Sequence, residues 1–205
     1  MIRLILIRHG ETIWNAEDRI QGQIDIPLNE TGWRQAQALA VWLAGDTFDA
    51  IYSSDLRRAL DTAAAIARPH ALDVIPDPRL RQSAKGVWEG LTWDEITARY
   101  PEQVAAWEAN HDMLPPGGET GAAYVGRLRE FLGDMTARHT GQTVLAVGHG
   151  HVIRTFICLG LGFDTSAAGH FEIVNAGVVE LHLHPGRGVL VRLNDTYPPP
   201  QEPTQ

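Results

Sequence analysis

Short apolar runs alternate along the chain with longer stretches of helical periodicity. Residues 2–7 form one such run and residues 143–147 another, and each is followed by polar residues and glycine. Short continuous runs of Val, Ile and Leu are typical of strands that are buried on both faces. The pattern predicts strands over residues 2–7, 50–52, 73–75, 143–147, 171–174, 178–184 and 188–193, the last two joined as a hairpin.

The stretches between these runs carry apolar residues at the spacing of amphipathic helices. Thr31 is the expected N-cap of a helix that runs through Leu43, and Ser54 or Asp55 that of a helix that runs through Ala67. The remaining predicted helices are two short ones within 92–109 interrupted at Pro101, one from Glu119 and Thr120 to Arg138, and one from His149 to Leu161.

Strands that alternate with helices predict an α/β fold. We expect a three-layer sandwich with a largely parallel sheet, helices on both faces and an antiparallel edge from the closing hairpin. No linker divides the chain, so residues 1–196 are expected to form a single domain. Residues 76–120 are the least regular part and are interpreted as an insertion over the pocket. The proline-rich residues 197–205 are interpreted as a disordered tail.

Composition narrows the range of partners. The 205 residues include 17 basic and 25 acidic side chains, for a formal net charge of -8. Nucleic acids favour a basic surface, so no nucleic-acid partner is expected, whereas a small phosphorylated substrate needs only a positive pocket. The single Cys158 fits a reducing compartment. With no visible signal peptide and no apolar stretch of membrane length, the sequence predicts a cytoplasmic protein without a membrane partner.

Two of the predicted strands lead into a histidine beside a glycine. Residues 2–7 are followed by Arg8-His9-Gly10-Glu11-Thr12, and residues 143–147 by Gly148-His149-Gly150. In open α/β sheets, ligands bind where strands end and helices begin, so neighbouring strands would bring His9 and His149 to one pocket. The helix after Gly150 would direct its N-terminal N–H groups at the same place. Arg8 and Arg58 are suited to bidentate contacts with phosphate oxygens.

These motifs resemble the histidine phosphatase superfamily, also called the phosphoglycerate mutase-like family. The segment Arg8-His9-Gly10-Glu11-Thr12 is similar to the family signature Arg-His-Gly-x-Thr. Three further blocks agree in the family's order over roughly residues 1–185. They are Gln21-Gly22 with residues 25–28, Gly32 and Gln35-Ala36; residues 53–59 with Thr62-Ala63; and residues 148–150 followed by Val152-Ile153-Arg154.

The resemblance implies a phosphatase mechanism with no cofactor and no metal. His9 is implied as the nucleophile that becomes a phosphohistidine, from which water releases inorganic phosphate. Arg8, Arg58 and His149 are implied to stabilise charge on the transferred group. Arg58 is preferred to its neighbour because the family's second arginine immediately precedes the alanine, here Ala59. The resemblance also suggests phosphate or substrate contacts from Asn15, which serves equally well as a helix cap, and from Gln21, Gly22 and Gly150.

The sequence departs from the family at Gln82. The family usually carries a glutamate there, whose carboxyl protonates the leaving oxygen and later activates water, and an amide does neither. Three explanations stay open. Another group, such as Glu89, Glu119 or His151, supplies the proton. Alternatively, the substrate has a good leaving group, such as an acyl phosphate or a phosphohistidine. In the third, the protein has lost efficient turnover and retains ligand binding.

The leading prediction is a phosphatase that acts on small phosphorylated metabolites. One alternative is a phosphoglycerate mutase, although family mutases usually carry a longer insertion over the site and Gln82 disfavours reversible transfer to a hydroxyl. Another is a weakly active or non-catalytic phospholigand-binding protein, which only Gln82 supports. No metal site is expected. His182 and His184 share a strand face without a third ligand, and the resemblance assigns His149 to phosphate rather than to a metal shared with His151.

Overall fold

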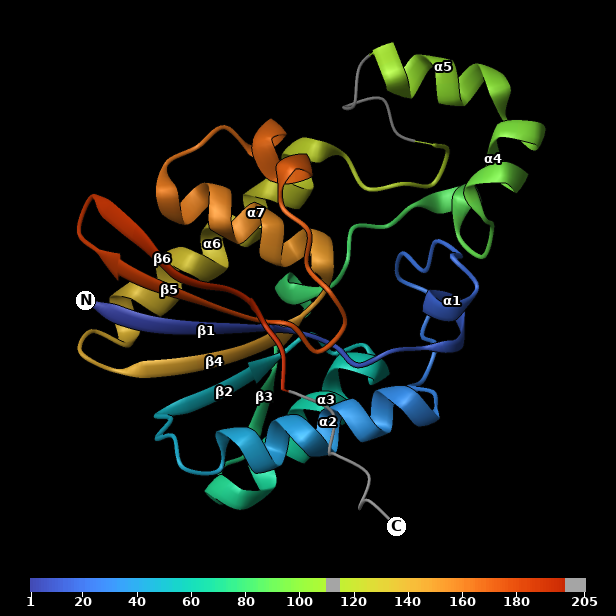
Figure 1. Cartoon of the computed structure of the whole chain (residues 1–205). Helices are drawn as coiled ribbons and strands as arrows, with labels where there is room; N and C mark the ends of the chain where they lie inside the picture. The colour runs from blue at the N-terminus through green and yellow to red at the C-terminus, as the bar shows by residue number, and fades with distance from the viewer. Residues whose placement is uncertain (110–114, 198–205) are drawn as a thin grey trace.

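A six-stranded sheet organises the chain (Figure 1). The computed structural model describes residues 1–109 and 115–197. The strands of the sheet are β1 (Ile2–Arg8), β2 (Ala50–Ser53), β3 (Val74–Pro76), β4 (Thr143–Gly148), β5 (Val178–His184) and β6 (Arg187–Asp195). Their order is β3-β2-β4-β1-β5-β6.

The sheet is parallel from β3 to β1 and antiparallel at its other edge. β1 pairs with β4 in parallel, with Arg8 opposite Gly148, and β2 pairs in parallel with both β3 and β4. β5 and β6 form a hairpin that pairs antiparallel with β1. The predicted α/β fold with a largely parallel sheet is confirmed, including the antiparallel edge from the hairpin.

The helices fall largely where their periodicity predicts them. The two short helices within residues 92–109 and the long helix that begins after Thr120 are confirmed. The α-helices are α1 (Ile13–Ala16), α2 (Glu30–Leu43), α3 (Arg57–Ala67), α4 (Trp93–Arg99), α5 (Pro101–Ala109), α6 (Gly121–Arg138) and α7 (Gly150–Leu161). Short 3-10 helices are η1 (Arg68–His70), η2 (Pro78–Leu80), η3 (Gly86–Trp88) and η4 (Thr165–His170).

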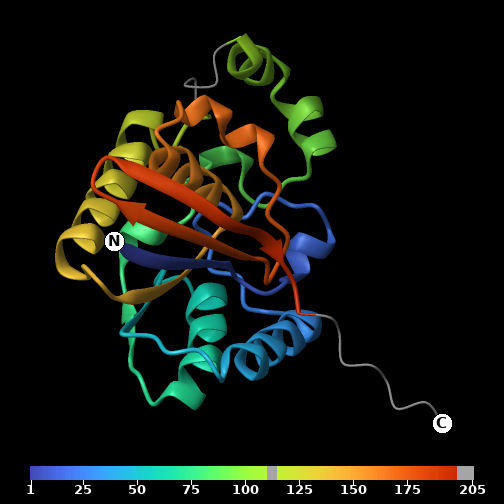
Figure 2. The same cartoon turned by 60° about the vertical axis from the view of Figure 1, so that its left-hand side comes forward.

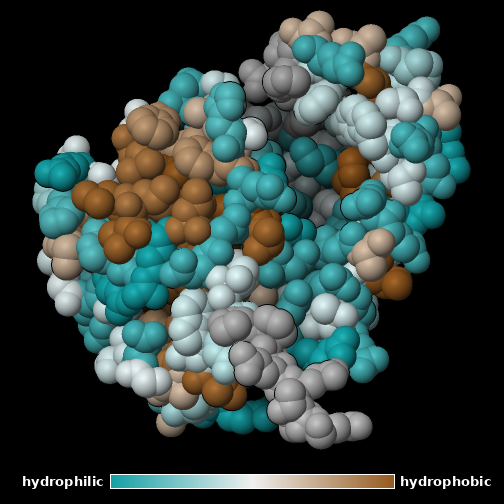
Figure 3. Space-filling view, in the orientation of Figure 1, coloured by the Kyte–Doolittle hydropathy of each residue, from teal (hydrophilic) through white to brown (hydrophobic). Residues whose placement is uncertain are grey.

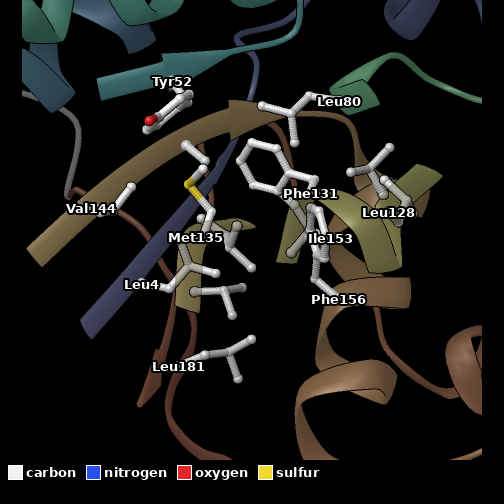
Figure 4. Packing of buried hydrophobic residues seen from close by; sticks show 14 of the residues in the cluster. Leu4, Tyr52, Leu80, Leu128, Phe131, Met135, Val144, Ile153, Phe156 and Leu181 are labelled. Atoms are coloured by element: carbon white, nitrogen blue, oxygen red, sulfur yellow. The ribbon is translucent and has the colours of Figure 1, made fainter. Parts of the chain in front are cut away.

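Alternation along β1 gives each face of the sheet its own hydrophobic cluster. Leu4 and Leu6 belong to the cluster formed with α6 and α7, part of which Figure 4 shows around Phe131 and Phe156. Ile5 and Ile7 point to the other face and belong to the cluster formed with α2 and α3. Figures 1 and 2 show these two helix pairs on opposite sides of the sheet. Side chains that alternate between two covered faces explain why the strand is continuously apolar from Leu4 to Ile7.

Two predicted helix starts are wrong. The N-cap of α2 is Asn29 rather than Thr31, because the Asn29 Oδ1 accepts a hydrogen bond of 2.8 Å from the Gly32 N–H. α3 begins at Arg57 after Leu56, which has no side-chain cap. The carboxylate of Asp55 is instead bound by Arg81, and the hydroxyl of Ser54 faces His149.

The predicted strand over residues 171–174 does not form. Side chains take the place of a neighbouring strand for this segment: Arg8 Nη1 donates to the Ile173 carbonyl over 2.6 Å, and Asn194 Nδ2 donates to the Glu172 carbonyl over 2.6 Å. The Val174 N–H donates to Asn194 Oδ1 over 3.0 Å. Because these side chains satisfy the backbone polar groups, the apolar pattern produces an extended segment without a strand partner.

Residues 76–109 and 115–120 contain η2, η3, α4 and α5, and they build a small hydrophobic cluster of their own around Trp88, Ile96 and Val104. The interpretation of residues 76–120 as an insertion stays a prediction. The predicted tail lies, apart from Tyr197, outside the described residues. No helix within the described ranges combines the length and apolar character that crossing a membrane requires.

Candidate active site

A pocket of about 270 Å³ lies at the carboxyl ends of β1 and β4, where α7 begins. In the space-filling view the surface is hollowed in this region, between α7 on one side and α1 and α4 on the other (Figure 3). Every site residue predicted from the sequence lines the pocket except Glu89 and Glu119. The lining residues are Arg8, His9, Asn15, Arg19, Ile20, Gln21, Gly22, Arg58, Gln82, Lys85, His149, Gly150, His151 and Arg154.

Parallel pairing of β1 and β4 brings His9 and His149 together. Arg8 lies opposite Gly148 in the register, and the His9 N–H donates to the Gly148 carbonyl over 3.0 Å. The two imidazole rings that follow meet edge to face, with centroids 5.2 Å apart. Two residues far apart in sequence thus become neighbours because their strands end at the same edge of the sheet.

His9 is held in one tautomer by its own backbone. Its Nδ1 lies 2.7 Å from the Gly10 carbonyl oxygen, which can only accept a hydrogen bond, so Nδ1 carries the proton and Nε2 keeps a lone pair. Burial, followed by the charges of Arg58 and Arg8, holds the pKa of His9 well below its usual value. The imidazole is therefore neutral at physiological pH, as a nitrogen nucleophile must be.

The glycine of the signature segment serves packing rather than anion contact. A Cβ on Gly10 would lie 2.5 Å from the carbonyl oxygen of Gly32, so the chain after β1 and the start of α2 approach too closely for a side chain. The Gly10 N–H donates to the Thr62 hydroxyl over 3.1 Å. These contacts from α2 and α3 fix the backbone on which His9 stands.

Arg58 is a buried cation and Arg8 a partly buried one, and both are anchored by backbone carbonyls. Arg58 donates from Nη1 to the Ile24 carbonyl and from Nη2 to the Gly22 carbonyl, both over 2.8 Å, while Arg8 is held by Ile173. The Nε of each is buried and has no hydrogen-bond partner among the described residues. Burial lowers the pKa of each guanidinium to about 10. In contrast to Arg58, its neighbour Arg57 points outward, with two-thirds of its side chain exposed.

Three further cations line the pocket, and the sequence pattern did not identify them as site residues. They are Arg19, Lys85 and Arg154. Arg19 is paired with Glu17 and Glu95. The described lining residues include no carboxylate. Burial of positive charge without a counter-ion is costly, so the arrangement favours a bound anion. Helical spacing from Gly150 and His151 to Arg154 could have revealed one of these residues, since all three lie on one face of α7.

The residues predicted to contact phosphate or substrate line the same pocket as these cations. Asn15 lines the pocket and also takes part in the capping box of α1. Its Oδ1 accepts from the Thr12 N–H over 3.2 Å and from Asn175 Nδ2 over 3.2 Å. The Gln21 Oε1 is buried without a partner among the described residues. Gly22 adopts a positive φ of 49°, which directs its carbonyl to Arg58. Gly150 is the first residue of α7 and lies beside Arg8. A Cβ placed on Gly150 would be 3.5 Å from the Arg8 Cδ.

The groups near Gln82 differ in how free they are to donate a proton. The Gln82 amide lines the pocket, and its Oε1 accepts from the Ser83 N–H over 3.2 Å. Glu89 lies outside the lining, and its Oε1 accepts from the backbone N–H groups of Gln23 and Lys85 over 3.0 and 2.8 Å. Glu119 likewise lies outside the lining and is bound by the guanidinium of Arg127.

His151 lines the pocket and stacks on Tyr124, with ring centroids 4.8 Å apart. Burial and the nearby charges of Lys85, Arg154 and Arg127 lower its pKa to about 4. Its imidazole is therefore neutral at physiological pH and is a poor proton donor in that state.

No group of three or more His, Cys, Asp or Glu side chains suited to a metal ion occurs in the part of the chain that the structure describes. His182, one of the pair on β5, lies with Nε2 2.7 Å from the buried carboxylate of Glu180. Glu180 in turn receives hydrogen bonds from Arg3. This cluster belongs to the sheet rather than to the pocket.

Comparison with known proteins assigns the family. The model of the histidine phosphatase superfamily (branch 1) matches residues 4–196. Phosphoserine phosphatase 1 of Hydrogenobacter thermophilus is 38% identical, over 96% of this chain and 93% of that protein. A metal-independent phosphoserine phosphatase of Arabidopsis thaliana is 38% identical, over 94% of this chain and 81% of its own length.

Among solved structures, a mycobacterial glucosyl-3-phosphoglycerate phosphatase complexed with VO3 matches with a TM-score of 0.86 and 32% identity. The match covers 95% of this chain and 99% of that one. Sequence, fold and pocket agree, and the chain belongs to the histidine phosphatase superfamily and is one of its hydrolases.

Proposed function

We propose that this protein hydrolyses phosphate monoesters of small metabolites through a phosphohistidine on His9. The observation that carries the proposal is the 2.7 Å contact between His9 Nδ1 and the Gly10 carbonyl, within a pocket lined by cations. That contact leaves the lone pair of Nε2 available for attack on phosphorus. A pocket volume of about 270 Å³ suits a small substrate rather than a macromolecule.

In the first step, Nε2 of His9 forms a bond to phosphorus as the bond from phosphorus to the ester oxygen breaks. Arg8 and Arg58 each have a buried Nε without a partner in the described part of the chain, and they donate hydrogen bonds to the phosphoryl oxygens, where negative charge is concentrated. The backbone N–H groups at the start of α7 add partial positive charge. In the second step, water forms a bond to phosphorus, the bond to Nε2 breaks, and inorganic phosphate leaves.

The similarity to phosphoserine phosphatases and to a glucosyl-3-phosphoglycerate phosphatase supports hydrolysis of a small phosphorylated metabolite. It favours transfer to water over transfer to a second hydroxyl, which a mutase requires. A mutase would depend on a bisphosphoglycerate primer, whereas the proposed phosphatase needs none. The proposed steps use no metal ion, because the arginines neutralise the transferred group.

Phosphate release from a panel of alkyl phosphate monoesters tests the proposal. Wild-type protein is expected to release phosphate without added metal or primer, and His9→Ala to lose activity by at least about 10³-fold. His170→Ala, which removes an exposed histidine, serves as the matched control and should retain wild-type activity. Full activity in His9→Ala would rule out the proposed nucleophile.

A further inference from the structure

The proposed phosphatase lacks the carboxyl that usually protonates the leaving oxygen, because Gln82 occupies that position. The nearby carboxylates do not replace it. The Glu89 Oε1 is committed to two backbone N–H groups, and Glu119 is bound by Arg127, and both lie outside the pocket lining. An alkyl ester nevertheless needs a proton on its departing alkoxide.

Lys85 is the only lysine in the 205-residue chain, and it lines the same pocket as His9 and Gln82. The other basic side chains besides the histidines are arginines, which do not lose a proton under biological conditions. Lysine is the one cation that both carries charge and exchanges its proton. The chain therefore places its single lysine ammonium in the pocket, three residues after the missing acid.

The Lys85 ammonium has no partner among the described residues, although its backbone is fixed. The Lys85 N–H donates to Glu89 Oε1 over 2.8 Å, and the residue forms an isolated bridge with Gly118. Among the described residues, no carboxylate lies within ion-pair distance of its Nζ, and its ammonium makes no hydrogen bond. Glu89 therefore has a positioning role: it holds the backbone from which the lysine reaches the pocket.

We propose that Lys85 is the general acid and base of this enzyme, in place of the missing carboxyl. The proposal rests on the proposed function. As Nε2 of His9 bonds to phosphorus and the ester P–O bond breaks, the ammonium transfers a proton to the departing oxygen, which leaves as a neutral alcohol. The resulting amine then takes a proton from the attacking water as the O–P bond forms and the N–P bond breaks, which restores the ammonium and the free His9.

The surroundings of Lys85 suit this exchange. Burial lowers the pKa of its ammonium, while the charges of Glu119 and Glu89 oppose that shift. A lowered pKa brings the proton donor closer to the working pH, where general acids are most effective. The Lys85 charge also helps to keep His151 neutral, so the ammonium, rather than the imidazole, holds the proton that is available in this part of the pocket.

The dependence of rate on the leaving group tests the proposal. Lys85→Met should lower kcat for an alkyl phosphate by about 10²- to 10⁴-fold, and should change hydrolysis of an acyl phosphate by less than about tenfold, because that leaving group needs little protonation. Lys85→Arg keeps the positive charge but cannot give up a proton, and it should show the same selective loss. Retained acyl phosphatase activity establishes that the variants fold and that His9 still works.

Restoring the carboxyl supplies the converse test. Gln82→Glu in the Lys85→Met background should recover at least about tenfold of the lost alkyl phosphatase activity. The proposal is overturned if Lys85→Arg is as active as wild type, or if Lys85→Met loses both activities alike, since Lys85 would then only bind an anion. A failure of His9 to become phosphorylated would instead overturn the proposed function itself.

Discussion

The Ser54 hydroxyl lies 3.0 Å from Nε2 of His149, and the two groups are completely buried. The same hydroxyl oxygen accepts from the Leu56 N–H over 3.4 Å, which leaves its proton free to be donated to the imidazole. When the Ser54 hydroxyl donates to Nε2, the histidine proton lies on Nδ1, which is buried without a partner among the described residues. In the proposed mechanism, this Nδ1–H donates to a phosphoryl oxygen.

Ser54→Ala should lower kcat by about tenfold, because His149 loses the contact that sets its tautomer and orientation. Ser53→Ala is the matched control: that hydroxyl is equally buried but donates to the Ser54 carbonyl. Steady-state kinetics and thermal unfolding should be measured for both variants. Equal losses of kcat in the two would show that packing, rather than His149, accounts for the effect.

Arg58→Lys should reduce kcat/KM by about 10²-fold despite conservation of charge. A lysine cannot donate to the Gly22 and Ile24 carbonyls and to phosphate at once, as the guanidinium does. Arg57→Lys, one residue away and exposed, should behave as wild type. Vanadate binding to both variants measures the loss of anion affinity separately from turnover. Tight binding by Arg58→Lys would argue against a role for Arg58 in phosphate recognition.

Gly22→Ala should destabilise the fold by about 2–4 kcal/mol. The positive φ of 49° is costly for alanine, and the new Cβ would lie 1.9 Å from Glu89 Oε1. Displacement of that oxygen breaks its hydrogen bonds to Gln23 and Lys85. Gly45→Ala, where a Cβ meets only open space, should be neutral in urea unfolding. A neutral Gly22→Ala would mean that Glu89 is not held as described.

Acid should destabilise the unliganded protein through its buried histidines. The pKa of His151 is about 4 in the folded state against 6.5 as the ordinary value, and burial also lowers the pKa values of His9 and His149. Between pH 6.5 and about 4 the unfolded chain binds protons that the folded chain does not. His151 therefore costs about 1.4 kcal/mol of folding stability per pH unit as the pH falls through this range, and His9 and His149 act in the same direction.

His151→Gln should make the free energy of unfolding depend less steeply on pH in that range, whereas His184→Gln, at an exposed position, should leave the dependence unchanged. Urea unfolding at pH 7 and pH 5 measures the difference. An unchanged slope in His151→Gln would show that the imidazole is protonated in the folded protein.

Local pattern was sufficient for most of the fold. The continuous apolar run before Arg8 identifies a strand covered on both faces, and the helical periodicity of α6 and α7 identifies the layers that cover it. Pattern alone failed where a side chain from a distant segment decides the outcome. Phe171 to Val174 have a strand-like composition, yet Arg8 and Asn194 bind their backbone instead of a neighbouring strand.

In the pocket, too, the sequence pattern predicts some residues and misses others. His9 and His149 were predictable because each follows a strand, and parallel pairing brings strand ends together. Lys85 was not found from the pattern, because it lies in an irregular segment between 3-10 helices whose path depends on tertiary contacts such as the one with Glu89. Its status as the sole lysine is visible in the sequence, but that signal acquires meaning only once the pocket is known.

The most direct test of the account is to trap the phosphorylated enzyme. Wild-type protein mixed rapidly with a phosphate-labelled monoester and quenched in alkali, which preserves phosphohistidine, should carry up to one phosphoryl group per chain, located on His9 by peptide mapping. The label should vanish in His9→Ala and persist in His170→Ala. Rapid hydrolysis with no label on His9 at any time would contradict the central claim, because water would then attack the substrate directly.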